Sequence, residues 1–328
     1  MLNLLITLNE DSILIEAMYL GLNEYYDQSF SLINQVLSKN PTSIKAYLLK
    51  AVILDYRMDD YGNNIGEDEF FECIDKVIKF SSSLLQSENR AEGYFFIGSA
   101  YALRAFRYGK KGIYAPILSD IINGIDYLNK ALEINKELYD AYLLLGLYNY
   151  ASDQFPSFVK FILRTGDTKK RKKLGIEQLE IAAQKSRYVN DLTKYALLEI
   201  YYRERMYNKA YETGKELIQK YNHSRNIRWI YGKSLRALGK WEEARVVYEE
   251  LLYLILDTRD FDKYQIVLSS YYTALSYYTL GKYEEAYQFL NFAYVVILEN
   301  LNVKELLKLK PRVENLMKNL ERYKGWNF

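Results

Sequence analysis

The 328-residue chain has one cysteine and one histidine, and this scarcity argues against metal and redox sites. Cys73 alone cannot form an intramolecular disulfide. It lies in the apolar helical pattern FFECIDKVI, which favours a buried small side chain over a reactive thiol. His223, in KYNHSRN, has no companion ligand and stands in no nucleophile motif. The sequence therefore predicts no metal, no cofactor and no enzymatic activity.

Proline is also scarce, with 4 residues, as suits a helical chain, because proline breaks helix interiors. No apolar run reaches the roughly 18 residues that a membrane-spanning helix needs, so no membrane insertion is expected. The N-terminal stretch MLNLLITLNEDS lacks the basic start and small-residue cleavage site of a signal peptide. As written, the chain fits a cytoplasmic protein, and it fits a periplasmic one if an export signal has been removed.

A strong net charge is absent as well. The balance is +2, too small to predict a nucleic-acid partner. The densest local charge is KKRKK, residues 169–173, preceded by Lys160 and Arg164. Such a run could attract anionic lipid, nucleic acid or an acidic peptide. Because no aromatic residues interleave with it and it falls on the first turns of an expected helix, a solvated face is favoured.

What the chain does have is tyrosine, 34 residues, and an internal repetition. LGKWEEA at 238–244 returns as LGKYEEA at 280–286. The alanine that ends each copy is followed by apolar or aromatic residues four and then three positions later. This spacing indicates a helix, a tight turn and a second helix, each helix with one apolar stripe. Most tyrosines are expected to fill half-buried packing positions in such an array.

The pattern resembles the tetratricopeptide repeat (TPR), a helical hairpin of about 34 residues with an alanine on its second helix. The alanines at this position, Ala210 and Ala244, are 34 residues apart, and Ala286 follows 42 residues later. The eight extra residues are expected in LYLILDTRDFDKY, residues 252–264. Four earlier hairpins are also expected, in 10–38, 44–85, 91–135 and 139–186.

The resemblance implies an all-α, right-handed α-solenoid of about seven TPR-like hairpins with a C-terminal capping helix. Its parts are expected in one array over 1–328: two repeats in 1–90, two with insertions in 91–190, three regular ones in 191–300, and the cap in 301–328. The cap would bury Leu309, Val313, Leu316 and Leu320, because terminal repeats need a cover.

Two adjacent repeats depart from the regular length. About 13 extra residues fall between the helices of the third repeat, in 104–120, and about 17 in the fourth, in 153–173. The apolar FPSFVKFIL in the second insertion has two interpretations. It is either an extra helix tucked into the core or across the groove, which we favour, or the wall of a ligand pocket. Asp167 is expected to cap the next helix.

This central region also resembles a bacterial group of TPR proteins of poorly defined function. The similarity covers about 91–185 and lies in YFFIGSAY, in YDAYLLLGLYNY, in a Pro-Phe hairpin, and in a Gly-Asp pair before the next helix.

The TPR resemblance implies a binding function without catalysis. In TPR arrays the first helix of each repeat lines a concave groove, and its exposed positions contact the partner. In the last three repeats these positions are Tyr195, Glu199, Tyr202, Arg203, Trp229, Lys233, Arg236, Tyr271 and Tyr278. Aromatic residues and arginine are typical of binding hot spots.

The expected partner is a protein or peptide. The Lys–Asn–Arg clamp with which chaperone-type TPRs hold a C-terminal carboxylate is absent. The alternative is a small-ligand-binding protein similar to the TPR partners of TRAP-type solute transporters, in which the two insertions close the groove into a pocket.

Overall fold

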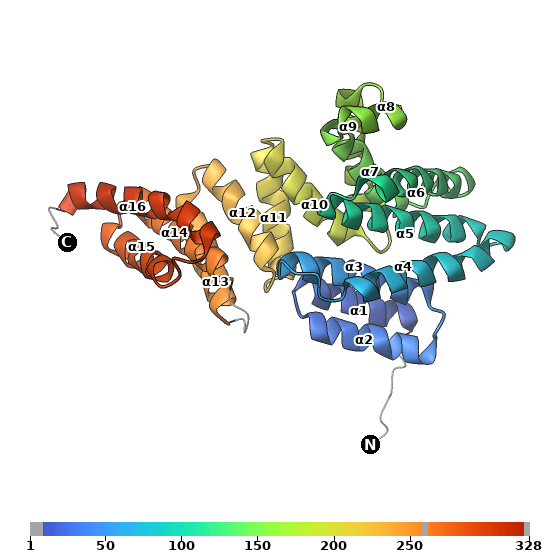
Figure 1. Cartoon of the computed structure of the whole chain (residues 1–328), viewed down its shortest axis with the longest axis horizontal. Coiled ribbons are helices and arrows are strands. Elements are labelled where there is room, and N and C mark those ends of the chain that lie inside the picture. Colours follow the sequence, from blue (N-terminus) through green and yellow to red (C-terminus); the bar gives the residue numbers. More distant parts are fainter. Residues whose placement is uncertain (1–8, 258–261, 325–328) are drawn as a thin grey trace, which may run out of the picture. The chain divides into compact units, whose positions relative to one another are not determined.

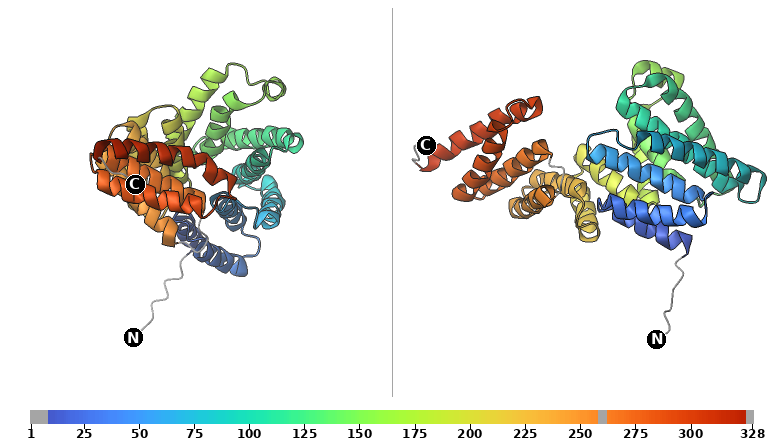
Figure 2. Two further views of the ribbon diagram at one scale, coloured as in Figure 1. Left: turned by 60° about the vertical axis from the view of Figure 1, so that its left-hand side comes forward. Right: turned by 60° about the horizontal axis from the view of Figure 1, so that its bottom comes forward.

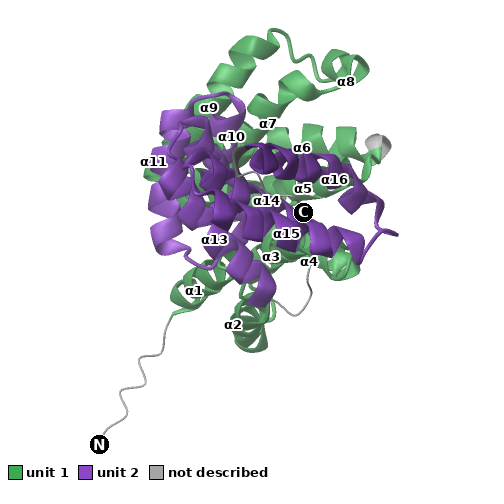
Figure 3. Cartoon of the chain, turned by 90° about the vertical axis from the view of Figure 1, so that its left-hand side faces the viewer, with its two compact units in different colours: residues 1–197 green, residues 198–328 purple. Residues whose placement is uncertain are grey.

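The structure, a computed structural model, describes residues 9–257 and 262–324, and every regular element in these ranges is a helix. The chain divides into two compact units, residues 1–197 and 198–328 (Figure 3), and each is described by itself. The first eight residues, on which the signal-peptide analysis depends, lie outside the described residues. No helix in the described ranges combines the length and the apolar character needed to cross a membrane.

The first unit is a series of antiparallel helical hairpins followed by the first part of α10 (Figure 1). Its helices are α1 (Glu10–Leu22), α2 (Tyr26–Lys39), α3 (Ile44–Asp60), α4 (Glu67–Ser82), η1 (Ser83–Gln86), α5 (Arg90–Lys111), α6 (Tyr114–Ile134), α7 (Ala141–Ala151), η2 (Ser152–Gln154), α8 (Ser157–Ile162), α9 (Thr168–Lys185) and α10 (Asn190–Arg203). The pairs α1–α2, α3–α4, α5–α6 and α7–α9 are the four hairpins expected from the sequence.

The second unit contains the end of α10 and six more helices. They are α11 (Tyr207–Lys220), α12 (Arg225–Ala237), α13 (Trp241–Asp257), α14 (Lys263–Thr279), α15 (Tyr283–Leu298) and α16 (Lys304–Lys324). The three repeat alanines, at 210, 244 and 286, are fully buried, each on the second helix of its hairpin. The repeated LGK turn depends on Gly239 and Gly281, which adopt φ values of 72° and 75° that favour glycine. Some of the eight extra residues between Ala244 and Ala286 are helical and lengthen α13 and α14 to 17 residues each. Residues 258–261 lie outside the described ranges.

The capping helix is confirmed. α16 packs on α14 and α15, and the four apolar residues expected on its inner face are at most 6% exposed. Cys73 is confirmed as a core residue, 3% exposed, and burial raises the pKa of its thiol to about 11.

The insertion in the third repeat differs from expectation. The predicted enlarged connection is wrong, because the extra residues are helical and lengthen α5 to 22 residues and α6 to 21. Only Gly112 and Ile113 lie between the two helices. Nothing in 104–111 breaks a helix, and Gly112, at φ 69°, ends α5 in the left-handed conformation typical of helix C-termini. Pro116 falls in the first turn of α6, where proline is tolerated.

The insertion in the fourth repeat folds as η2, the short helix α8 and a five-residue connection. Asp167 caps α9 as expected, accepting hydrogen bonds from the backbone amides of Lys169 and Lys170 at 3.1 Å. The expected tucking of this segment into the core is only partly right. Val159 is 4% exposed, whereas Phe161, two residues later, is 84% exposed because it lies on the outer side of α8.

Candidate functional site

Helix α12 carries three of the residues expected to line the groove. Trp229, Lys233 and Arg236 are four and three positions apart, so they share one face of the helix. The other side of α12 is held in the core by buried residues such as Ile227 and Leu235. Ser224 fixes the start of the helix by accepting a hydrogen bond from the backbone amide of Ile227.

Aromatic rings from the second helix of the same hairpin and from the next hairpin surround this face. The Trp229 ring lies edge-on to Tyr248 of α13 and Tyr272 of α14, with ring centres 5.9 Å and 5.5 Å away. Tyr248 and Tyr272 stack on each other at 5.5 Å. Aromatic pairs in such geometries stabilise packing beyond the area they bury.

The guanidinium group of Arg236 lies 3.8 Å above the centre of the Tyr272 ring. Its Nε donates a hydrogen bond of 3.1 Å to the hydroxyl of Tyr248, a fully buried residue. Burial raises the pKa of Tyr248, and Arg236 opposes that shift. Arg236 is therefore held by rings and a hydroxyl, and no carboxylate of the described residues pairs with it.

Lys233 is half-buried and lies over two rings, with its Nζ 5.2 Å from the centre of Trp229 and 5.7 Å from that of Tyr202. Burial lowers the pKa of Lys233, Glu199 opposes the shift, and the cations Arg236 and Arg203 add to it. Across 9–257 and 262–324, its ammonium group has no hydrogen bond or ion pair. A half-buried ammonium group without a hydrogen bond or ion pair is well placed to bind an anionic group of a ligand.

We call Tyr202, Trp229, Lys233, Arg236, Tyr271 and Tyr272 the α12 surface. Glu199 and Arg203 lie next to it and pair with each other at 2.5 Å, and Tyr271 meets Tyr272 edge-on at 5.2 Å.

Two other expected groove residues make separate ring contacts. Tyr278 packs on Tyr283 of α15, and Tyr195 belongs to the first unit, where its ring is 5.9 Å from Tyr56. Sequence reasoning missed Tyr248 and Tyr272. Tyr248 occupies a packing position of the repeat, so its hydroxyl contact with Arg236 leaves no signal in the spacing.

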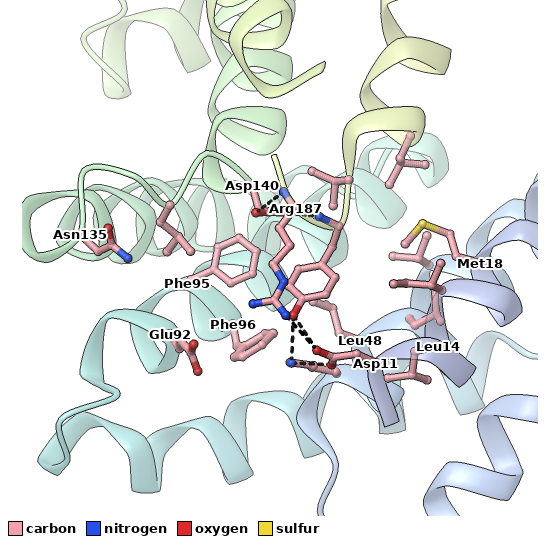
Figure 4. A pocket seen from close by; sticks show the side chains of 18 of the residues that line it. Asp11, Leu14, Met18, Leu48, Glu92, Phe95, Phe96, Asn135, Asp140 and Arg187 are labelled. Carbon is pink, nitrogen blue, oxygen red and sulfur yellow. Dashed lines mark hydrogen bonds and ion pairs between the residues drawn. The ribbon is translucent and has the colours of Figure 1, made fainter. Parts of the chain in front are cut away.

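The first unit contains a pocket of about 390 Å³ among α1, α3 and α5 (Figure 4). The connection from α9 to α10 reaches across it: Tyr188 donates a hydrogen bond of 2.9 Å to Asp11 of α1. Lys45 of α3 pairs with the same carboxylate at 2.8 Å. Asp140 holds the connection by accepting hydrogen bonds from the backbone amides of Arg187 and Tyr188.

The charged groups at this pocket form ion pairs and hydrogen bonds mainly with one another. Lys45 is the main reason why the pKa of Asp11 is lowered, with Tyr188 and Arg187 adding to it and burial opposing it. The rest of the lining is mostly apolar, with Phe95 and Phe96 on one wall and α1 and α3 side chains on another. The pocket thus offers a ligand mainly apolar area.

A second cavity, of about 450 Å³, lies between the two insertions. The long hairpin α5–α6 supplies Phe106, Ile117 and Ile121, and the fourth repeat supplies Phe155 and Val159. FPSFVKFIL therefore lines this cavity through Phe155, Pro156 and Val159, and its interpretation as the wall of a ligand pocket stays a prediction.

Comparisons with known proteins concern the fold. No family model matches the sequence, and no curated protein matches it. A chain of the APC/C hetero-tetramer Cut9–Hcn1 is similar at 14% sequence identity and a TM-score of 0.51, over 96% of this chain and 57% of that one. This chain thus spans a little over half the length of that neighbour.

Two further solved structures are less similar. The TPR2AB domain of yeast Sti1 in complex with pHSP90 is 12% identical, with a TM-score of 0.34, over 95% of this chain and 98% of that one. The human IFIT1 dimer with m7Gppp-AAAA is 15% identical, with a TM-score of 0.41, over 82% and 67%. Similarities with TM-scores this low do not establish a shared fold or function. Together with the helical hairpins, the similarity to the Cut9–Hcn1 chain shows an all-α helical-repeat fold of the tetratricopeptide type.

Proposed function

We propose that this chain is a non-catalytic binding protein whose α12 surface takes a peptide segment with an acidic side chain next to an apolar or aromatic one. The observation that carries the proposal is Lys233, a half-buried ammonium group with no anionic partner among the described residues. Arg236, 3.8 Å above Tyr272, offers a second cation without a carboxylate.

The chemistry of the ligand follows from what these groups lack. A carboxylate that paired with Lys233 or Arg236 would form a charge-assisted hydrogen bond in a site already partly shielded from water. The rings of Tyr202, Trp229 and Tyr271 would cover an adjoining apolar side chain, since all three are only partly buried. Arginine and aromatic residues in one cluster are the composition typical of binding hot spots.

Selection of random displayed peptides on the full chain tests this proposal. We expect enriched peptides to carry Asp or Glu beside Leu, Phe or Trp, and their binding to weaken with rising salt. The double variant Lys233→Met and Arg236→Met should bind the enriched peptides roughly 30-fold more weakly, because it removes both cations.

The control variant is Lys215→Met with Lys220→Met. These lysines also lie over tyrosine rings, at 5.9 Å from Tyr211 and 5.5 Å from Tyr221, but on α11, the second helix of its hairpin. The control should bind like the wild type. Enrichment of basic peptides, or equal loss in both double variants, would contradict the proposal.

A second candidate function, small-molecule binding, is favoured by the cavity between the insertions. At about 450 Å³ it falls within the size range of ligand pockets, and its lining is almost entirely apolar. We infer an apolar molecule as its ligand. Native mass spectrometry of the gently purified full chain should then show a bound small molecule, and Val159→Glu, which places a carboxylate in the wall, should release it. Recovery of only the bare mass in repeated preparations would refute this candidate.

A further inference from the structure

Four large apolar side chains are exposed at one edge of the first unit, on α8 and the start of α9. We call residues 153–174 the α8–α9 tip, and Figures 1 and 2 show α8 and the adjoining end of α9 at the periphery of that unit. The exposed side chains are Phe158, Phe161, Ile162 and Leu174, with exposed fractions of 52%, 84%, 48% and 45%. Single exposed hydrophobic residues are ordinary, but a group of them marks an interaction surface.

The same segment is strongly basic. Residues 153–174 contain seven lysines and arginines and two aspartates, a balance of +5. The side chains of Lys170 and Lys173 are 88% and 82% exposed, and their nearest carboxylates are 4.0 Å and 3.8 Å away. The two aspartates accept hydrogen bonds from within the tip. Asp153 accepts one from the Thr168 hydroxyl at 2.7 Å, and Asp167 caps α9.

Contacts within the tip join the segment around α8, which carries most of the exposed apolar residues, to the start of α9, which carries the basic run. The hydrogen bond from Thr168 to Asp153 joins the start of α9 to η2, immediately before α8. The Arg171 guanidinium donates to the carbonyl of Thr165 in the connection between α8 and α9. On its other side, α8 is anchored by Val159, which lines the cavity under it. These contacts hold α8 in place, with its outer side exposed to solvent.

We propose that the α8–α9 tip docks on the surface of a membrane that contains anionic lipid. Phe161 and Ile162 would enter the headgroup region, and the lysines of α9 would lie near the lipid phosphates. Apolar insertion and a basic cluster are the two signals that together give stable peripheral binding, which neither gives alone. No spanning helix is required.

A membrane fits these residues better than a nucleic acid does. Binding to single strands rewards aromatic rings that alternate with basic residues along a groove. Here the basic run 169–173 contains no aromatic residue, and two of the four exposed apolar side chains, Ile162 and Leu174, are aliphatic. The solvated face was expected for this run from its charge alone, without the exposed apolar residues Phe161 and Ile162 that precede it in the same tip.

Vesicle co-sedimentation of the full chain tests the proposal. We expect binding to vesicles of phosphatidylcholine and phosphatidylserine in equal parts, and little binding to phosphatidylcholine alone. The triple variant Lys169→Gln, Lys170→Gln and Lys173→Gln should partition on the order of 100-fold more weakly. Phe161→Ser should lose roughly 10-fold, since it removes a buried aromatic group from the bound state.

Matched variants exist for both changes. Lys304, Lys308 and Lys318 are exposed on the basic helix α16, so their change to Gln alters the net charge equally. Ile65, 68% exposed, is the control for Phe161. Both controls should bind anionic vesicles like the wild type.

Three results would overturn the proposal. The first is equal sedimentation with both kinds of vesicle, and the second is equal loss in the α16 variant. The third is lysine-dependent binding to single-stranded RNA without vesicle binding, which would assign the tip to nucleic acid.

Discussion

Replacing Arg107 with methionine is expected to lower the free energy of unfolding by about 3–5 kcal/mol. Arg107 is only 3% exposed, yet it is charged and lies among three carboxylates. Its Nε is 3.1 Å from Glu67, its Nη1 is 3.6 Å from Asp55 and 3.7 Å from Asp59, and its Nη2 donates to Asn64 at 2.7 Å. Methionine keeps much of the volume but removes the central cation, so that, among the described residues, Asp55 and Asp59 retain only Lys110 and Glu67 retains only Lys111. Urea denaturation of the full chain measures the loss.

The control for this change is Arg203→Ala. Arg203 also pairs with a carboxylate, Glu199, at 2.5 Å, but both side chains are about half exposed. A surface pair of this kind contributes about 0.5 kcal/mol. Adding Glu67→Gln and Asp55→Asn to the Arg107→Met variant should restore part of the lost stability. If neutralising the carboxylates restored none, the loss would come from packing and not from the excess of negative charge that the missing guanidinium leaves.

The loss should also depend on pH. Burial raises the pKa of Asp55 above its ordinary value of 3.8, and Lys110 and Arg107 oppose that shift. A carboxyl group whose pKa is higher in the folded state costs stability above that pKa, and the cost disappears as the pH falls through it toward the unfolded value. Without Arg107 the pKa of Asp55 rises further. The variant should therefore be closer to the wild type in mildly acidic buffer than at neutral pH.

The helical hairpins could be predicted from the sequence because their determinants are local. The spacing of Ala244, Tyr248 and Leu251, and the glycine of each LGK turn, specify a helix, a tight turn and a second helix without knowledge of the rest of the chain. The cap of α9 by Asp167 is equally local, since the contacts lie two and three residues apart. Such features are read correctly from residue type and position alone.

The network around Arg107 and the contact between Tyr188 and Asp11 could not be predicted in this way. Arg107 meets Glu67, 40 residues away, and Tyr188 meets Asp11, 177 residues away. Neither distance is a multiple of the repeat, so no periodicity marks the partners.

The ring contacts of the α12 surface could not be predicted for a related reason. Tyr248 and Tyr272 contribute through ring packing with Trp229 and Arg236, which depends on how two hairpins stack. The enlarged third repeat was misjudged because an insertion between helices resembles a loop until its own helical propensity is considered.

Replacing Gly175 with alanine is expected to destabilise the chain by about 3 kcal/mol, although alanine is the better helix former. Gly175 of α9 faces Gly146 of α7 where the two helices cross. A Cβ at Gly175 would lie 2.5 Å from the backbone nitrogen of Tyr150, 2.6 Å from the carbonyl oxygen of Gly146, and 3.0 Å from the Tyr150 Cα. All three are backbone atoms, so no side-chain rotation relieves the clash and the helices must separate. Thermal and urea denaturation should both report the loss.

The same substitution at Gly109 separates this packing effect from helix propensity. Gly109 is also within a helix, α5, but a Cβ there would meet no atom within 4 Å. Gly109→Ala should therefore raise the free energy of unfolding by up to about 1 kcal/mol, because alanine loses less conformational entropy on folding. One chemical change is thus expected to have opposite signs at two helical sites. Equal effects at both sites would contradict the close approach of α7 and α9, since propensity alone does not distinguish the two glycines.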